Sequence, residues 1–355
     1  MDEPYIVASW PCVPVEIVRA AGLRPTFAQG LGDPTPIADS CLEPHIFPSR
    51  LRHLVEAARA GLLRGASRIV IARTSDADYK CFLYLREFVR TEAGSAIPPV
   101  VLFDLLQSHS EDVRSYDVAR TYALVEELGS ASGRMPSDDD LRHEIARTNR
   151  ARAAARRLTE LRRIAPRVAG TEVFPLLAAF WEMEPDQYVT LADEAAREIA
   201  ARSPLTGPRV LLTGAPVDDS ALHQAIESAG AVVVAEVGPW GSGAPGEDVR
   251  CDDDPVAALA DKYRTDVIGP RTPVDAVRRW TGRLLDEVDA VVVSLPLDDA
   301  VFGWDYPVLR EVLVARRIPH VCLRDSPHES PPPADHARLD AMVAAASQLQ
   351  ETSRG

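Results

Sequence analysis

The chain has 355 residues, of which 46% are hydrophobic, and this is enough for two domains with complete hydrophobic cores. Its formal net charge of -14 at pH 7 makes nucleic acid and anionic membrane surfaces unfavourable partners. The sequence also lacks any apolar run of about 18 residues, the length that a membrane-spanning helix needs.

The N-terminal residues MDEPYIVASW contain two acids and no basic residue, so they do not resemble a signal peptide. The five cysteines are scattered, and none of them forms a CxxC pair. Scattered cysteines in odd number are typical of a protein that keeps its thiols reduced. The sequence therefore predicts a cytoplasmic protein.

The first third of the chain alternates short β-branched runs with amphipathic helices, a pattern that is typical of parallel α/β units. The predicted strands are residues 4–9, 24–28, 67–73 and 98–104. Ser9 is at the carboxyl end of the first strand and Cys12 follows it, and Ser75 and Asp76 follow the third. Because ligands bind beyond the carboxyl ends of parallel strands, these positions are candidates for a site, although a small buried residue is the favoured interpretation of Cys12.

Cys41 lies in a polar segment between prolines, whereas buried structural cysteines usually lie in apolar runs. It is therefore a candidate ligand or pocket residue. Arg50 follows at the beginning of a predicted helix, where it is placed to pair with a phosphate or carboxylate.

The middle of the chain, residues 115–206, has helical periodicity and no strand pattern. Gly129 and Gly133 are predicted to end its first helix, and Ser137 is predicted to be the N-cap of the next. That second helix carries many arginines. They fit either a solvated face that covers apolar surface or, less well, a binding patch.

The last part returns to strands, namely PRVLLTG, AVVVAEV, DAVVVSL and residues 318–323. The strand DAVVVSL is followed by Asp298 and Asp299, again at a carboxyl end. The whole pattern predicts an α/β protein with two parallel-sheet lobes joined by a helical segment. The expected boundaries are 1–114 for the first lobe, 115–206 for the helical segment, 207–330 for the second lobe and 331–355 for a tail.

Several segments, in order, resemble the 2-hydroxyacyl-CoA dehydratase family, which includes the benzoyl-CoA reductase small subunits. They are PCVPVEIVRAAGLRP, MPSDDDLRHEIARTNRARAAARRLTELRRIAPRVAGTE, GPRVLLTGAPVDDSALHQAIESAGAVVVAEV, PVAALADKY and DAVVVSLPLDDAVFGWDYPVLREVLVARRIPHVCL. The resemblance covers roughly residues 4–325 and implies two Rossmann-like lobes that face a cleft.

The family also implies a cofactor and partners. A [4Fe-4S] cluster held by three cysteines delivers one electron to an acyl-CoA thioester, which then loses a hydroxyl group. A homologous second subunit and an ATP-hydrolysing activator complete the system.

This sequence departs from the family pattern at two of the three cysteine positions. Cys41 matches the first, Ser75-Asp76 stands where the second has Cys-Asp, and Asp298 stands at the third. Iron–sulfur clusters are held by thiolates, so one cysteine with a serine and an aspartate is a weak ligand set.

The residues also permit a chemistry without a cluster. We expect Cys41, Ser75 and Asp298 to line one pocket, with Ser75 as a hydrogen-bond donor to the substrate and Asp298 as a general base. Ser9, Arg50 and Asp76 are the expected substrate-binding residues, and Cys41 is the expected metal ligand.

Three functions remain open from the sequence. The chain is a subunit that takes part in acyl-CoA chemistry, a cluster-free and non-catalytic partner subunit, or a two-lobed cytoplasmic protein that binds a small molecule.

Overall fold

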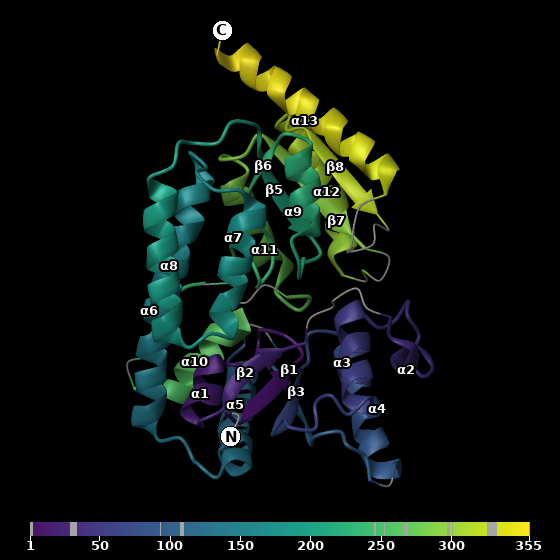
Figure 1. Ribbon diagram of the computed structural model, residues 1–355, viewed down its shortest axis with the longest axis vertical. Helices are drawn as coiled ribbons and strands as arrows, with labels where there is room; N and C mark the ends of the chain where they lie inside the picture. Colours follow the sequence, from purple (N-terminus) through teal and green to yellow (C-terminus); the bar gives the residue numbers. More distant parts are fainter. Residues whose placement is uncertain are drawn as a thin grey trace. The chain divides into compact units, whose positions relative to one another are not determined.

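The structure of the chain is a computed structural model (Figure 1). It describes residues 3–28, 34–92, 94–106, 110–244, 246–251, 253–265, 269–296, 299, 301–324 and 332–354. The chain divides into two compact units. Unit 1 comprises Met1–Arg150, Trp181–Pro185 and Gly246–Thr272, and unit 2 comprises Ala151–Phe180, Asp186–Pro245 and Pro273–Gly355.

Unit 1 contains a four-stranded, all-parallel sheet with the strand order β2-β1-β3-β4. Its strands are β1 (Tyr5–Ala8), β2 (Arg24–Phe27), β3 (Arg68–Ala72) and β4 (Val100–Phe103). Its helices are α1 (Val15–Ala20), α2 (Pro36–Asp39), α3 (Ser49–Arg59), α4 (Asp76–Thr91), α5 (Glu111–Ser132) and α10 (Pro255–Thr265). Strands of a parallel sheet are covered on both faces, which explains the continuous apolar runs in β1 and β3.

The hydrophobic core of unit 1 brings α3 and α4 against the sheet. Val7 of β1 and Ile69 of β3 pack in one cluster with Leu51 of α3 and with Cys81 and Leu85 of α4. Both helices begin near the sheet's polar edge, since α4 follows β3 after only three residues. The core therefore fixes the N-terminal turns of α3 and α4, where several of the predicted site residues lie.

Unit 2 contains a second four-stranded, all-parallel sheet with the strand order β6-β5-β7-β8. Its strands are β5 (Arg209–Gly214), β6 (Val232–Glu236), β7 (Ala290–Leu295) and β8 (His320–Arg324). Its helical elements include α7 (Gly170–Ala178), α9 (Ala221–Ser228), α11 (Val274–Leu284), η2 (Phe302–Trp304), α12 (Tyr306–Ala315) and α13 (Pro333–Arg354). In Figure 1, α13 runs beside β8, and it also contacts β7 and α9.

Three helical elements have residues in both units. They are α6 (Asp138–Arg163), η1 (Ala179–Trp181) and α8 (Pro185–Ala200). No residue between 115 and 206 forms a strand, and every residue of this segment is described. None of the described helices combines the length and the apolar character that crossing a bilayer requires.

The structure confirms the predicted fold class, an α/β protein with two parallel sheets joined by a helical segment. The domain boundaries at residues 114, 206 and 330 stay a prediction. The predicted helix end at Gly133 is confirmed, because α5 ends at Ser132 and Gly133 is its C-cap with a left-handed φ of 74°. The predicted end at Gly129 is wrong, because Gly129 lies inside α5. Gly129 instead allows close packing, since a Cβ there would lie 2.8 Å from the Met135 sulfur.

Candidate functional site

Ser9 lies directly after β1 and is fully buried. Its hydroxyl accepts a hydrogen bond from the backbone N–H of Ala72 at 3.0 Å, which ties the ends of β1 and β3 together. Its carbonyl accepts a hydrogen bond from Nη1 of Arg50 at 3.1 Å. Two predicted substrate-binding residues, Ser9 and Arg50, are therefore in direct contact at the carboxyl edge of the unit 1 sheet.

Arg50 also forms a buried ion pair with Asp78. Its Nη2 lies 2.8 Å from Oδ1 of Asp78, and the side chains are 8% and 0% exposed. The guanidinium carbon lies 4.8 Å from the centre of the Trp10 ring, a cation–π distance. The ion pair joins the first turn of α3 to the first turn of α4. Arg50 therefore links both helices to Ser9 at the end of β1.

Ser75 is the N-cap of α4, and its hydroxyl is engaged. It donates to Oδ2 of Asp78 at 2.7 Å and accepts from the Asp78 backbone N–H at 3.2 Å. The hydroxyl and backbone N–H of Thr74 donate to the same carboxylate oxygen, at 2.7 and 3.2 Å. The geometry gives Ser75 a capping role, and its catalytic role stays a prediction.

Sequence reasoning missed Asp78, which is the centre of this network. Its signal was present, because Ser75 is followed three residues later by an acid at a predicted helix start, as in a capping box. What the sequence could not supply was the partner, since Arg50 reaches Asp78 from another helix.

Two further residues that the sequence predicted for the site, Asp76 and Cys41, also belong to unit 1. Asp76 is exposed in the first turn of α4, where an acid is favoured by the helix dipole. Cys41 is partly buried against the core, and its thiol donates to the carbonyl of Ala38 at 3.2 Å. Nη1 of Arg59 lies 3.8 Å from the Cys41 sulfur. Asp298 lies outside the described residues, so the pocket predicted for Cys41, Ser75 and Asp298 stays a prediction.

The other two thiols of this region, those of Cys12 and Cys81, are free and buried. Burial raises the pKa of the Cys12 thiol, and the Asp78 carboxylate raises it further. The same two causes raise the pKa of the Cys81 thiol. Both side chains are buried, and Cys81 lies in the hydrophobic core of unit 1. In the described part of the chain, no three His, Cys, Asp or Glu side chains gather as a metal site.

Unit 2 has a buried charged group at the carboxyl end of β6, which sequence reasoning also missed. Oε1 of Glu236 accepts from Nη2 of Arg162 at 2.6 Å and from the backbone N–H of Ser242 at 2.6 Å. Nε2 of His223 lies 3.3 Å from Oε2. Burial alone would raise the pKa of Glu236, but Arg162 and His223 outweigh it and hold this pKa well below its usual range.

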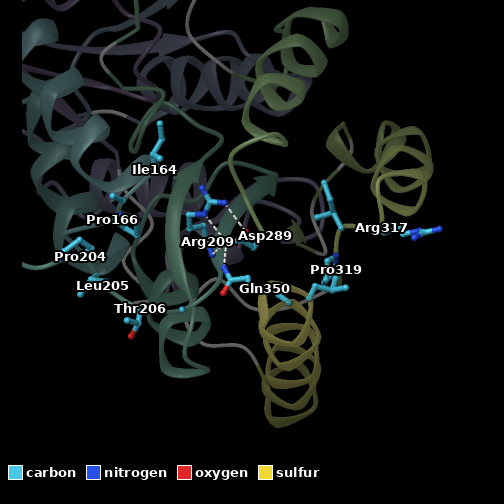
Figure 2. A pocket seen from close by; sticks show the side chains of 15 residues that line it. Ile164, Pro166, Pro204, Leu205, Thr206, Arg209, Asp289, Arg317, Pro319 and Gln350 are labelled. Atoms are coloured by element: carbon cyan, nitrogen blue, oxygen red, sulfur yellow. Dashed lines mark hydrogen bonds and ion pairs between the residues drawn. The ribbon is translucent and has the colours of Figure 1, made fainter. Parts of the chain in front are cut away.

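Unit 2 also has a cavity of about 530 Å³ at the edge where β5, β7 and β8 begin (Figure 2). Asp289 lies in it, and its carboxylate accepts from Nε and Nη2 of Arg209, both at 3.0 Å, and from Gln350 at 2.7 Å. Apolar residues such as Ile164 and Leu205 form other parts of the wall. The charges of Arg209 and Asp289 therefore already satisfy one another within the cavity wall.

The family model described as 2-hydroxyglutaryl-CoA dehydratase, D-component, matches residues 12–330. No curated protein matches the chain. The matched region contains every strand from β2 to β8 and all the predicted site residues except Ser9. Because the match covers most of its length, the chain belongs to the 2-hydroxyglutaryl-CoA dehydratase D-component family.

Proposed function

We propose that the chain is a subunit of a complex that removes water from a 2-hydroxyacyl-CoA thioester to give the enoyl-CoA. The observation that carries this proposal is the family match over residues 12–330. The network of Ser9, Arg50 and Ser75 supports it, since ligands of parallel sheets bind beyond the carboxyl ends of the strands.

Within this proposal the residues divide by role. Arg50 and Ser9 position the ends of β1 and β3, because their polar groups are already paired inside the protein. Asp298 is the proposed base that touches the substrate. Ser75 serves as a donor to the substrate only when its hydroxyl releases the hydrogen bond that it donates to Asp78. Asp76 is exposed beside Ser75 and completes the proposed substrate contacts.

The chemistry of the donor set favours one form of the proposal. Because Cys41 alone stands at a family cysteine position, we infer that this chain does not hold a cluster by itself. The homologous subunit then holds the redox group, and an ATP-hydrolysing activator supplies the electron. This form combines two of the functions that the sequence leaves open, because the subunit takes part in the acyl-CoA chemistry but holds no cluster. The scattered cysteines support the cytoplasm as its location.

The test is anaerobic purification of the chain alone and after co-expression with its homologous subunit. We expect the two chains to co-purify, and we expect iron and sulfide in the complex but less than one iron per chain in this chain alone. Cys41→Ala should leave the iron content of the complex unchanged. A full set of iron and sulfide on the isolated chain, lost in Cys41→Ala, would show that this chain does hold a cluster.

A further inference from the structure

Two arginines share one carboxylate at the carboxyl edge of the unit 1 sheet. Arg73 follows β3 and Asp104 follows β4, and both positions are fixed by the sheet. Nη1 of Arg73 lies 2.9 Å from Oδ2 of Asp104. Nη1 of Arg271 lies 2.9 Å from the other oxygen, Oδ1. Two positive charges therefore face one negative charge, and the group keeps a net charge of one.

The excess charge comes with unused hydrogen-bond donors. Nε and Nη2 of both arginines have no hydrogen-bond partner among the described residues, and Nε of Arg73 is buried as well. In the described structure each oxygen of Asp104 accepts from one arginine Nη1 only. The arginine side chains are 27% and 26% exposed, so a ligand can reach them, while partial burial keeps the charge effective.

Both guanidinium groups are held in place by further contacts. Arg73 lies over the ring of Tyr79, with 4.8 Å between the guanidinium carbon and the ring centre. Arg271 donates from Nη1 to the carbonyl of Leu105 at 3.2 Å as well as to Asp104. Because these cations are already ordered, a ligand would not have to immobilise them, and this lowers the cost of binding.

From this geometry we propose that Arg73 and Arg271 bind a phosphate group of the acyl-CoA, in its pyrophosphate or its 3′-phosphate. Guanidinium groups present paired N–H donors that match phosphate oxygens, and two of them on one anion are stronger than one. The edge is the one that carries Ser9, Arg50 and Ser75, so both ends of the substrate would meet the same side of the sheet. The inference rests on the proposed function, which supplies the substrate class.

The test is the dissociation constant of the full-length chain for an acyl-CoA and for the matching acyl-pantetheine, which lacks these phosphates. Arg73→Gln and Arg271→Gln should each weaken acyl-CoA binding about 10- to 100-fold, the range for hydrogen bonds to a charged group. Acyl-pantetheine binding should not change. The acyl derivative of 3′-dephospho-CoA, which keeps the pyrophosphate, shows which phosphate is bound. If the two arginines bind the 3′-phosphate, wild type should bind this compound as weakly as the variants do. If they bind the pyrophosphate, wild type should bind it more tightly than the variants do.

Arg52→Gln is the matched control. Arg52 is 23% exposed and pairs with a single carboxylate, that of Asp39, so it has no excess charge to offer. This variant should bind acyl-CoA as wild type does. A variant that is merely damaged in its fold loses both ligands, and equal losses for acyl-CoA and acyl-pantetheine would overturn the inference.

The outcomes separate this inference from the proposed function. If neither substitution affects acyl-CoA binding, the proposed phosphate site is contradicted and the proposed function is not. Binding of inorganic pyrophosphate that depends on Arg73 and Arg271, without any binding of acyl-CoA, supports the anion site and contradicts the proposed function. Failure of wild type to bind either compound contradicts both.

Discussion

Asp78 is the residue on which the candidate site of unit 1 depends. Its carboxylate, which is fully buried, accepts from Thr74 and Ser75 and pairs with the largely buried Arg50. Removing one partner of a buried ion pair is costly, because the other charge is left buried and unpaired. The pair is therefore a structural requirement of the site whatever the substrate is.

We predict that Asp78→Ala lowers the free energy of unfolding by about 3–5 kcal/mol, the range for one lost member of a buried pair. The measurement is urea denaturation followed by circular dichroism. Glu87→Ala is the control, because Glu87 pairs with Arg90 on an exposed helix surface and should change stability little. Equal effects of the two substitutions would contradict the assignment.

Glu236 gives a second prediction at this scale, which concerns pH. Arg162 and His223 hold its pKa below the value of about 4.3 expected in the unfolded chain. A carboxylate with a lowered pKa stabilises the folded state above the unfolded pKa, and this stability is lost progressively as the pH falls from the unfolded pKa to the lower folded pKa.

Wild type should therefore lose stability more steeply than Glu236→Gln when the pH falls from about 5 to about 3. Urea midpoints measured across this range test the prediction. The glutamine variant is itself the control for all other carboxylates, since they titrate in both proteins. Parallel curves would mean that Glu236 contributes no pH dependence.

At the scale of single elements, the start of α6 shows what a local pattern can predict. The sequence placed an N-cap at Ser137, and the structure confirms it, because the hydroxyl accepts from the backbone N–H of Asp140 at 3.1 Å. Asp140 in turn accepts from the backbone N–H of Ser137 at 3.0 Å, which completes a capping box. Gly129 shows the limit, since glycine also serves close packing, and that use depends on Met135 rather than on local sequence.

We predict that Ser137→Ala costs about 1 kcal/mol of stability, as is usual for a lost N-cap. The Ser137 hydroxyl is also the main cause that lowers the pKa of Asp140 to about 2. The substitution should raise this pKa toward the ordinary value, and NMR titration of the carboxyl carbon measures it. Ser203→Ala, at an exposed position outside the helices, is the control. An unchanged Asp140 pKa would contradict the capping box.

At the scale of the whole molecule, the sequence predicted what depends on neighbours along the chain. Continuous apolar runs predicted both parallel sheets, and helical periodicity predicted the strand-free segment 115–206. Several sequence segments that occur in the same order as in the family predicted the family, and the match over residues 12–330 confirms it. The side-chain networks were missed, because their members are far apart in the sequence. Arg162 meets Glu236, and Arg271 meets Asp104, only after folding. The predicted catalytic residues stay predictions.

The most direct test of the central claim is an anaerobic assay that follows the conversion of a 2-hydroxyacyl-CoA to the enoyl-CoA. The homologous subunit and the activator are assayed with and without this chain, in the presence of ATP and a reductant. The account predicts water loss only when this chain is present, and a rate that Asp78→Ala reduces. An equal rate without the chain, from a homologous subunit that does not bind it, would contradict the account.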